Sequence, residues 1–424
     1  MSKFDDAVKY IMDIPKFQGK NTLEDTAKFL AKVYRDESSK VVHVAGTNGK
    51  GSTCSYMNSI LQKSGFSVGL FTSPHLVSIR ERIVINDVMI SEDEFTEAFE
   101  RIMDIIKEEG MEHHPSFFEY LFLMAMYCFA KRGVDYIILE TGLGGRLDAT
   151  NCVKSKKLCV ITKIGLDHTE YLGNTVSQIA GEKAGIIKQR VPVVFWDNQD
   201  ESYDAISRVA KDKNCACYSI NQKDVFLKRQ TKEFIDFLIE CEYYRYDNLK
   251  ISTVALYQIY NASLAVLGCI VLDEKSITKE TIASGLFTAR WAGRMEEVEP
   301  SVFLDGAHNP DGIVTFLESV KAVSCEEKRK LLFSVVADKQ YDAMCRLIIE
   351  SELFDAVYIG GIDSSRALDM ESIGKCFADC PCEVFSFDSA TDAFLEAKKS
   401  LGDKDMLFVA GSLYLVGQLK TMYS

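Results

Sequence analysis

The sequence predicts an α/β protein: a mononucleotide-binding domain with a phosphate loop and a central, mostly parallel sheet, followed by a smaller, Rossmann-like doubly wound α/β domain. Three observations lead to this prediction. Apolar strands alternate with segments of helix length along most of the chain, which is typical of parallel sheets. A glycine-rich loop stands between the first apolar strand and the next helix. A polar, acidic stretch that ends at Pro300 separates two such runs.

The composition excludes several classes of protein. The 424 residues suit two or three domains, and 47% hydrophobic with 26% charged residues is ordinary globular composition. A net charge of -13 argues against a general nucleic-acid binder or a protein that binds anionic membranes. Thirteen cysteines without a CxxC pair indicate free thiols in a reducing compartment. No apolar run reaches the length of a membrane span and no signal-peptide pattern opens the chain, so we expect a cytoplasmic protein.

A phosphate-binding loop follows the first predicted strand, residues 41–45. Glycines let the backbone approach a phosphate, and the next helix offers the positive end of its dipole. A lysine adds charge for the outer phosphates, and a hydroxyl can bind Mg²⁺. A glycine-rich surface turn is the alternative, but strand, glycines, lysine, hydroxyl and helix together favour binding of ATP or another nucleoside triphosphate. The loop residues are Gly46, Thr47, Asn48, Gly49, Lys50, Gly51 and Ser52.

The neighbouring segments predict helices and one more strand. Apolar spacing places two helices within residues 3–35, joined through residues 15–20. The helix after the phosphate loop should end near Gly65, and Val68–Phe71 forms the second strand. Residues 79–86 alternate charged and apolar side chains, which is usual for a solvated strand or loop. Two further helices are predicted, an acidic amphipathic one at 91–109 and a buried one at 116–131.

Polar side chains follow three further strands at the point where each strand ends. Ser73 comes after the second strand, at the edge where open α/β sheets bind ligands; it is a metal or substrate candidate, and a capping serine is equally compatible. Glu140 ends the apolar strand 135–140 before a loop with three glycines, which favours a carboxylate beside Mg²⁺. His168 follows the strand 158–163, and its position as a third polar strand end favours function over a structural histidine.

Two polar residues lie in apolar helical segments. Burial of Lys183, between small residues of 179–187, would lower its pKa and leave a reactive amine, although the residue pattern alone favours an exposed helix lysine. Asn261 lies in a long apolar helix predicted at 252–272. A polar side chain there must find a partner, and either a core hydrogen bond or a ligand contact would supply one.

The second domain begins after a polar linker. We predict a first domain at residues 1–295, a linker at 296–299 and a second domain at 300–424. The second domain opens with a strand and a polar loop that contains Asp305 and His308, and it lacks the GxGxxG pattern of a dinucleotide binder. Its further strands are predicted at 331–336, 356–359, 384–387 and 407–410, with helices between them, including 390–400.

Several motifs, in order along nearly the whole chain, resemble the Mur ligase superfamily. The loop GTNGKGS at 46–52 is similar to the phosphate loop of that superfamily. The other motifs resemble its folylpolyglutamate synthase branch, which includes bifunctional dihydrofolate synthases. They are ETGLGGRLDATN at 140–151, LDHT at 166–169, GEKAGI at 181–186, DGAHNP at 305–310 and GSLYLVG at 411–417.

The resemblance implies a ligase for folates. ATP would phosphorylate a carboxylate of the folate or dihydropteroate substrate, and the amine of L-glutamate would then displace phosphate. Lys50, His168 and Lys183 would be catalytic, with Lys183 carried as a carbamate rather than as an exposed amine. The resemblance assigns two Mg²⁺ ions to Ser52, Ser73, Glu140 and His168, further ATP contacts to Asn261, Arg294, Asp305 and His308, and substrate contacts to Ser73, Pro74, His75 and Arg82.

Other expectations concern assembly and the alternatives. The resemblance implies a monomer with small-molecule substrates, and closure of the two domains on ATP. Another Mur-type amino-acid ligase would use a different acceptor, and the motifs at 140–151 and 305–310 argue against it. A nucleotide-switch ATPase is the alternative from another class, and phosphate release that depends on glutamate would exclude it.

Overall fold

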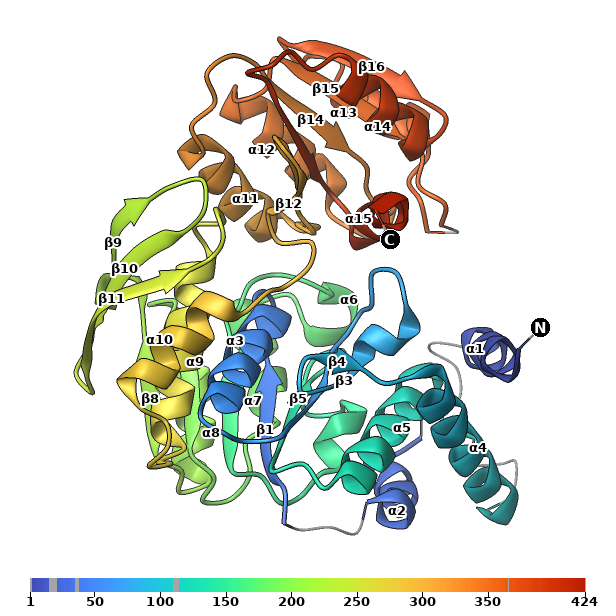
Figure 1. Cartoon of the computed structure of the whole chain (residues 1–424), viewed down its shortest axis with the longest axis vertical. Helices are drawn as coiled ribbons and strands as arrows, with labels where there is room; N and C mark the ends of the chain where they lie inside the picture. The colour runs from blue at the N-terminus through green and yellow to red at the C-terminus, as the bar shows by residue number, and fades with distance from the viewer. Residues whose placement is uncertain (1, 15–20, 35–37, 110–113, 365, 424) are drawn as a thin grey trace. The chain divides into compact units, whose positions relative to one another are not determined.

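The computed structural model describes residues 2–14, 21–34, 38–109, 114–364 and 366–423. The chain forms two compact units (Figure 1). Unit 1 comprises Met1–Phe226, Leu238–Leu249 and Tyr260–Ala289, and unit 2 comprises Leu227–Phe237, Lys250–Ile259 and Arg290–Ser424.

An eight-stranded sheet forms the centre of unit 1. Its strand order is β4-β3-β2-β5-β1-β6-β7-β8, with parallel pairing from β2 to β8 and an antiparallel β3–β4 hairpin at one edge. The strands are β1 (Lys40–Ala45), β2 (Val68–Phe71), β3 (Ile83–Ile85), β4 (Val88–Met89), β5 (Tyr136–Glu140), β6 (Leu158–Ile161), β7 (Val193–Trp196) and β8 (Cys217–Ile220). The loops after β1, β2, β5 and β6 therefore leave the sheet at the same edge.

Helices cover both faces of this sheet. On one face, Gly268 of α9 lies against Met57 of α3 and Leu158 of β6, and α10 packs on α3. On the other face, Val41 packs with α5 and Ala45 packs with α7 and α8, because alternate residues of a strand point to the same side. These helices are α3 (Lys50–Lys63), α5 (Phe117–Arg132), α7 (Val176–Ala184), α8 (Glu201–Asp212), α9 (Gln258–Val271) and α10 (Lys279–Thr288).

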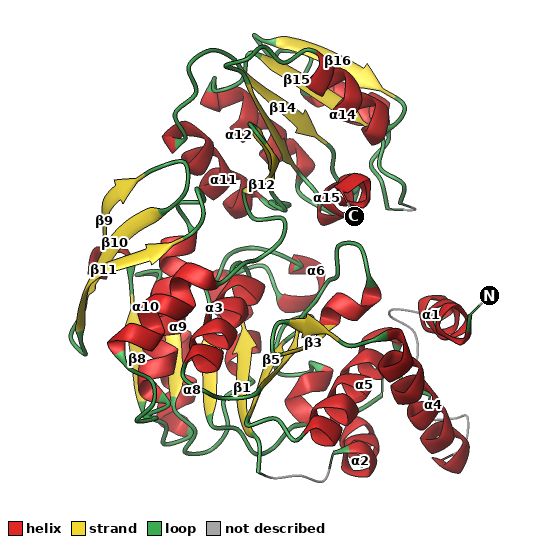
Figure 2. Ribbon diagram, viewed as in Figure 1, coloured by secondary structure: helices red, strands yellow, loops and turns green. Residues whose placement is uncertain are grey.

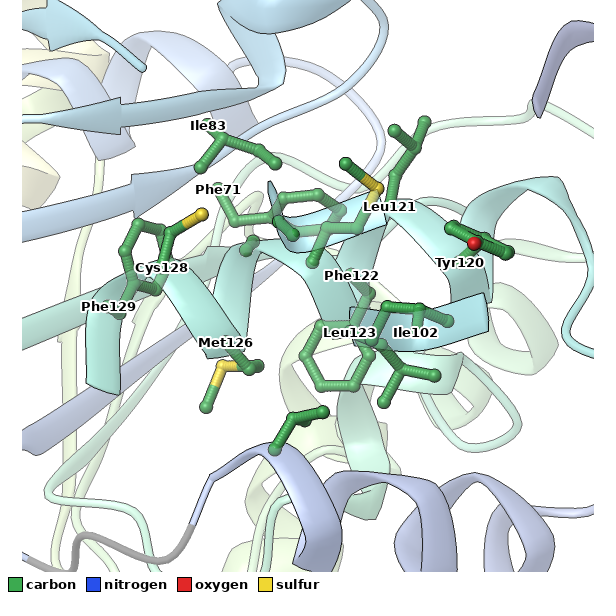
Figure 3. Close-up of a cluster of buried hydrophobic side chains, with 14 of the residues drawn as sticks. Phe71, Ile83, Ile102, Tyr120, Leu121, Phe122, Leu123, Met126, Cys128 and Phe129 are labelled. Atoms are coloured by element: carbon green, nitrogen blue, oxygen red, sulfur yellow. The ribbon is translucent and has the colours of Figure 1, made fainter. Parts of the chain in front are cut away.

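The buried helix α5 forms the centre of an apolar cluster of unit 1. Figure 3 shows side chains of α5, among them Phe122 and Leu123, beside Phe71 of β2 and Ile102 of α4. Since α5 is apolar almost all round, it must be covered by other helices. Three helices contribute to the same cluster: α1 (Lys3–Asp13), α2 (Leu23–Val33) and α4 (Glu92–Glu109).

Smaller elements complete the fold. A short helix, α6 (Thr169–Leu172), follows the loop after β6. A separate three-stranded sheet has the order β11-β10-β9, with β9 at Val225–Gln230, β10 at Ile235–Glu240 and β11 at Arg245–Ile251. Among the described residues, none of the helices combines the length and apolar character needed to cross a membrane.

Unit 2 is a second α/β layer structure (Figure 2). Its six-stranded sheet has the order β12-β13-β17-β14-β15-β16 and is parallel except for the β12–β13 pair. Phe333 and Phe408 of the sheet pack with Phe316 of α11 in its core. The strands are β12 (Glu296–Glu299), β13 (Val302–Leu304), β14 (Arg329–Phe333), β15 (Ala356–Gly360), β16 (Glu383–Phe387) and β17 (Met406–Ala410). The helices are α11 (Pro310–Ala322), α12 (Tyr341–Ser351), α13 (Met370–Cys376), α14 (Ala390–Lys399) and α15 (Leu413–Lys420).

The structure confirms the predicted fold class and corrects three local predictions. The helix predicted at 252–272 begins only at Gln258, because the backbone N–H of Leu256 donates to the Ser319 hydroxyl (3.1 Å). The predicted linker 296–299 forms strand β12, which pairs with β13. The segment predicted as a solvated strand or loop at 79–86 contains a 3₁₀ turn at Ile79–Arg82 and the buried Arg82 before it enters β3. The predicted junction at residues 15–20 lies outside the described residues.

Candidate active site

The phosphate loop adopts a backbone that requires glycine at two positions. Gly46 has a φ of 152° and Gly49 a φ of 87°, both in the region that side chains disfavour. A Cβ at Gly46 would stand 1.8 Å from the Thr162 hydroxyl, and a Cβ at Gly49 would stand 2.1 Å from Oδ1 of Asn261. The structure therefore brings Asn261, from helix α9, against the loop.

The loop is anchored to the end of strand β6. The backbone N–H groups of Thr47 and Asn48 donate to the carbonyl of Lys163, at 3.0 and 3.3 Å. The Thr162 hydroxyl donates to the Asn48 carbonyl (2.7 Å), and the Thr47 hydroxyl contacts Gly165 (3.1 Å). These bonds fix the backbone of the loop before the start of helix α3. The first N–H groups of a helix have no partner within the helix, so they are available to a ligand in the loop.

Lys50 and Ser52 lie in the first turn of α3. The ammonium of Lys50 donates to the Thr47 carbonyl (3.3 Å), so it curls back over its own loop. Ser52 is 2% exposed. The positive end of the helix dipole and a lysine charge together favour the binding of a phosphate here. Thr53 adds a buried hydroxyl without a hydrogen-bond partner.

The carboxylate of Glu140 lies at the end of the strand next to the phosphate loop. Glu140 is 3% exposed and is paired in register with Val44 of β1. The backbone N–H of Ser73 donates to Glu140 Oε2 (3.0 Å), so the structure joins two of the predicted metal ligands. The buried hydroxyl of Thr141, the next residue, has no hydrogen-bond partner. This edge of the sheet thus collects hard oxygen atoms, which Mg²⁺ prefers.

The turn that carries the predicted substrate contacts is closed by side chains. The carboxylate of Glu81 accepts hydrogen bonds from the backbone N–H groups of residues 76–78, at 2.7–2.9 Å. Nε of Arg82 donates to Nδ1 of His75 (2.8 Å), and the guanidinium lies over the ring of Phe117, 5.3 Å from its centroid. A cation over an aromatic face is attracted by the ring quadrupole, which stabilises the buried charge of Arg82. Pro74 of the same turn is exposed.

Lys183 is buried, contrary to the interpretation that its residue pattern alone favours. It is 4% exposed, and its Nζ donates to the Gly46 carbonyl (2.7 Å). Burial, together with the nearby charge of Lys50, lowers the pKa of Lys183 to about 7. A neutral amine is therefore available at the phosphate loop near neutral pH.

His168 follows β6, as predicted, but it lies beyond the loop that leaves Ile161, as the residue that precedes helix α6 (Thr169–Leu172). It has a φ of 51°, and its side chain is 39% exposed. Its Nε2 stands 3.9 Å from Oδ2 of Asp167, and its backbone N–H donates to Asp167 Oδ1 (2.9 Å). The carboxylate orients an accessible imidazole, which can serve as a metal ligand or a proton carrier.

In unit 2, a buried carboxylate organises the other predicted nucleotide contacts. Asp305 accepts hydrogen bonds from Tyr257 Oη (2.6 Å), from the N–H of Met295 (2.9 Å) and from the N–H of Ala307 (2.8 Å). Burial raises the pKa of this carboxyl above its ordinary value. Asp305 thereby fixes the two segments that carry Arg294 and His308. A direct contact between Asp305 and ATP stays a prediction.

Sequence reasoning missed two residues that hold these segments. The residue pattern placed Glu81 in a solvated charged run, yet it closes the turn after β2. Tyr257 was placed inside a helix, yet it contacts Asp305. A capping-box search would have found Glu81, which follows Ser78 by three residues. No sequence signal indicates the contact of Tyr257.

A substitution at Gly49 tests the geometry of the loop. We expect Gly49→Ala to abolish ATP binding or to lower it at least tenfold, because the added methyl group needs the space of Asn261 and an unfavourable φ. Isothermal titration with ATP measures the effect. Gly65→Ala is the control, since Gly65 also has a positive φ, of 90°, but has open space around its Cβ position. Equal losses in both variants would contradict the expectation.

The strand, glycine loop and helix, with a carboxylate on the adjacent strand, define a P-loop nucleotide-binding protein. The family model of the Mur ligase middle domain matches residues 44–269, and that of the Mur ligase glutamate ligase domain matches residues 293–413. Dihydrofolate synthase/folylpolyglutamate synthase of Bacillus subtilis is 33% identical, over 98% of each chain. The chain therefore belongs to the Mur ligase family, in its dihydrofolate synthase/folylpolyglutamate synthase branch.

Solved structures show the same fold over the whole chain. Escherichia coli FolC in complex with DHPP and ADP superposes with a TM-score of 0.86 at 26% identity, covering 99% of this chain and 97% of that one. Folylpolyglutamate synthase of Thermotoga maritima gives a TM-score of 0.85 at 31% identity, covering 99% and 96%.

Proposed function

We propose that this protein is an ATP-dependent ligase that adds L-glutamate to folates, both by extending tetrahydrofolate and by converting dihydropteroate to dihydrofolate. One observation supports this most strongly: a complete phosphate loop, with Lys50 and the neighbouring Glu140, in a chain similar over 98% of its length to a dihydrofolate synthase/folylpolyglutamate synthase. The complex of E. coli FolC with DHPP and ADP supports the same substrate classes.

The reaction has two steps. A carboxylate oxygen of the folate attacks the γ-phosphorus of ATP, and the bond from that phosphorus to the β,γ-bridging oxygen breaks. ADP departs, and the folate carboxylate has become an acyl phosphate. The glutamate amine then attacks the acyl carbon, phosphate departs with the C–O bonding electrons, and the amine loses a proton. The loop N–H groups and Lys50 stabilise negative charge on the transferred phosphoryl group. The turn closed by Glu81 would hold the folate through His75 and Arg82.

The residues at the sheet edge fit Mg²⁺. Glu140, Ser52 and Ser73 offer oxygen ligands, and the unpartnered buried hydroxyls of Thr53 and Thr141 add polar atoms beside them. Within the described part of the chain, no three His, Cys, Asp or Glu side chains gather into a possible metal site, so phosphate and water would complete the coordination. Bound there, Mg²⁺ would neutralise phosphate charge. His168 is the fourth proposed ligand.

We further propose that Lys183 is carried as a carbamate. Its neutral nitrogen attacks the carbon of CO₂, one C–O π bond breaks with its electrons moving to oxygen, and the nitrogen passes a proton to water. The neutral amine thus becomes a carboxylate. The burial of Lys183 and the low pKa of its amine support this. The buried carboxylate would face the phosphate loop through which Lys183 already contacts Gly46.

The remaining proposals concern domains, assembly and location. We propose that Arg294 and His308 contact ATP, held by Asp305. We also propose functional domains over 1–295 and 300–424, with residues 296–299 joined to the second domain through the pairing of β12 with β13. We also propose a monomeric enzyme in the cytoplasm, whose partners are ATP, L-glutamate and folate. The free state of all thirteen cysteines supports a reducing compartment.

A ligation assay tests the function. The protein would be incubated with Mg-ATP and L-glutamate, with dihydropteroate and with tetrahydrofolate in separate tubes, and the products measured by mass. We expect glutamate addition in both tubes. Addition to tetrahydrofolate alone would remove the dihydrofolate synthase activity from the proposal. Phosphate release without glutamate or folate would favour the nucleotide-switch alternative.

His168→Ala tests the proposed metal contact. We expect the Mg²⁺ concentration for half-maximal ligation to rise about tenfold, because one ligand to the ion is lost. A Mg²⁺ titration at saturating ATP measures this change. Tyr171→Ala is the control, since Tyr171 is exposed and lies one turn of chain further on. An unchanged titration in His168→Ala would contradict the assignment.

A further inference from the structure

A buried lysine outside the predicted site donates to three acceptors. Nζ of Lys156 contacts Nδ1 of His43 (2.6 Å), Oδ1 of Asn151 (2.8 Å) and the carbonyl of Ile186 (2.9 Å). Burial lowers the pKa of Lys156 to about 7 and the pKa of His43 well below its usual value. Against this effect of burial, three acceptors surround the nitrogen and match the three hydrogens of an ammonium, so the hydrogen bonds favour the protonated lysine beside a neutral imidazole.

The contacts continue through His43 to the glycine loop after Glu140. Because Nδ1 of His43 accepts from Lys156, Nε2 carries the proton and donates to the Thr150 hydroxyl (2.7 Å). That hydroxyl donates to Oδ1 of Asp148. Oδ2 of Asp148 accepts from the backbone N–H groups of Gly142 and Leu143, at 2.9 and 3.0 Å. The three hydrogen bonds that link Lys156 to Asp148 are thus all donated in the direction of Asp148, which also accepts the two bonds from the glycine loop.

The same lysine also reaches the end of helix α7, which carries Lys183. Asn151, held by Lys156, donates to the carbonyls of Arg146 (3.0 Å) and Gly185 (3.1 Å). A Cβ on Gly145 would lie 2.8 Å from the Lys183 carbonyl, so the glycine loop and α7 are in close contact. Two backbone segments of the site thus share one buried polar network.

The network lies between two apolar clusters. His43 belongs to strand β1 and points to the same face as Val41 and Ala45, which pack in different clusters. Buried polar groups cost stability unless all of them are bonded, and a fully bonded network fixes one arrangement. Apolar side chains at these positions could fill the core, but they could not fix the loop and the helix relative to each other by directed bonds.

We propose that Lys156 is a positioning residue of the ligation reaction, which acts through His43, Thr150 and Asn151 to set the places of the glycine loop after Glu140 and of Lys183. The inference rests on the ligase function proposed above. The hydrogen bonds of Lys156 go to His43, Asn151 and Ile186, none of which belongs to the phosphate loop or to the turn after β2. Its substitution should therefore lower the rate of the bound complex more than it lowers substrate affinity.

The test compares two variants with wild type in the ligation assay. Lys156→Met keeps the length of the side chain and removes its donors; Thr150→Val keeps the volume and breaks the contact between His43 and Asp148. We expect kcat to fall at least tenfold in Lys156→Met, with KM for ATP and for L-glutamate within threefold of wild type. We expect the double variant to lose no more than about twice what the stronger single variant loses, because both act in one network.

Lys330→Met is the matched control. Lys330 is equally buried, bonded to Ser400 and paired with Asp405 (3.2 Å), but it belongs to strand β14 of unit 2 and makes these contacts within that unit. Its kcat should stay within twofold of wild type. Should Lys156→Met not fold, Thr150→Val decides alone, with at least a fivefold loss of kcat expected.

Three results would overturn the inference: an unchanged kcat in the folded variant, an equal loss in Lys330→Met, or losses that multiply in the double variant. Absence of product with wild-type protein would instead overturn the ligase function itself. The two proposals therefore fail by different observations.

Discussion

Lys50→Ala will lose ligation by about 10³-fold or more, since a cation that meets the transferred phosphoryl group contributes that order of rate. In the structure the Lys50 ammonium donates to the Thr47 carbonyl within the loop (3.3 Å). The phosphates of ATP would replace this contact. The effect should appear in kcat more than in KM, because the charge on the phosphoryl oxygens develops as the bond breaks. Single-turnover formation of ADP with folate present measures it.

The fold should survive this substitution. Lys50 is the first residue of α3 and makes one hydrogen bond to its own loop, so the melting temperature should change little. Lys63→Ala, at the exposed last turn of the same helix, is the control and should keep full activity. Turnover within tenfold of wild type in Lys50→Ala would contradict the role assigned to the phosphate loop.

Lys183→Ala will lose at least about 10²-fold in kcat, and short carboxylates such as formate or acetate will restore part of it. The substitution opens a small cavity beside the Gly46 carbonyl, where a free carboxylate can take the place of the carbamate. In wild type the carbamate needs a neutral amine. The pKa of Lys183 is about 7, so the fraction of neutral amine rises as the pH increases through 7. The fraction of enzyme that carries the carbamate, and the activity at limiting bicarbonate, should rise with it.

Native mass spectrometry and the rescue of activity by formate check this expectation. Native mass spectrometry should find one CO₂ adduct in wild type and none in Lys183→Ala. Lys188→Ala is the control. Lys188 also has a lowered pKa, but it donates to the Asn151 carbonyl (3.1 Å) rather than to the phosphate loop. Formate should therefore not raise the activity of the Lys188→Ala variant. An active wild-type enzyme with an unmodified Lys183 would refute the carbamate.

Local signals predicted much of the fold. The phosphate loop was recognised because its strand, glycines and helix start are contiguous in the chain, and the capping box of Ser91 with Glu94 marked the start of α4. The strand ends were recognised because an apolar run stops at a polar residue. Such features are determined by residues near one another in the sequence, and the structure confirms them.

Burial that depends on distant partners was not predictable in the same way. Lys183 meets Gly46 across 137 positions of the chain, so the pattern of its own helix indicated exposure. Arg82 lies in an alternating charged run typical of solvated strands, yet it is covered by Phe117. His43 lies in an otherwise apolar strand, so no neighbouring residue indicates its partner. That partner, Lys156, lies 113 positions away in the chain. Only the resemblance of the whole motif set corrected the first of these interpretations.

The turn after β2 is closed at three places before any substrate arrives: at Glu140, at the Glu81 carboxylate and between His75 and Arg82. Immobilising a flexible segment on binding typically costs about 0.5–1.5 kcal/mol for each ordered side chain. Here that entropy has already been lost during folding. At this proposed folate site the substrate would meet a surface ordered in advance, so more of its contact energy would remain for holding the carboxylate in line with the γ-phosphate.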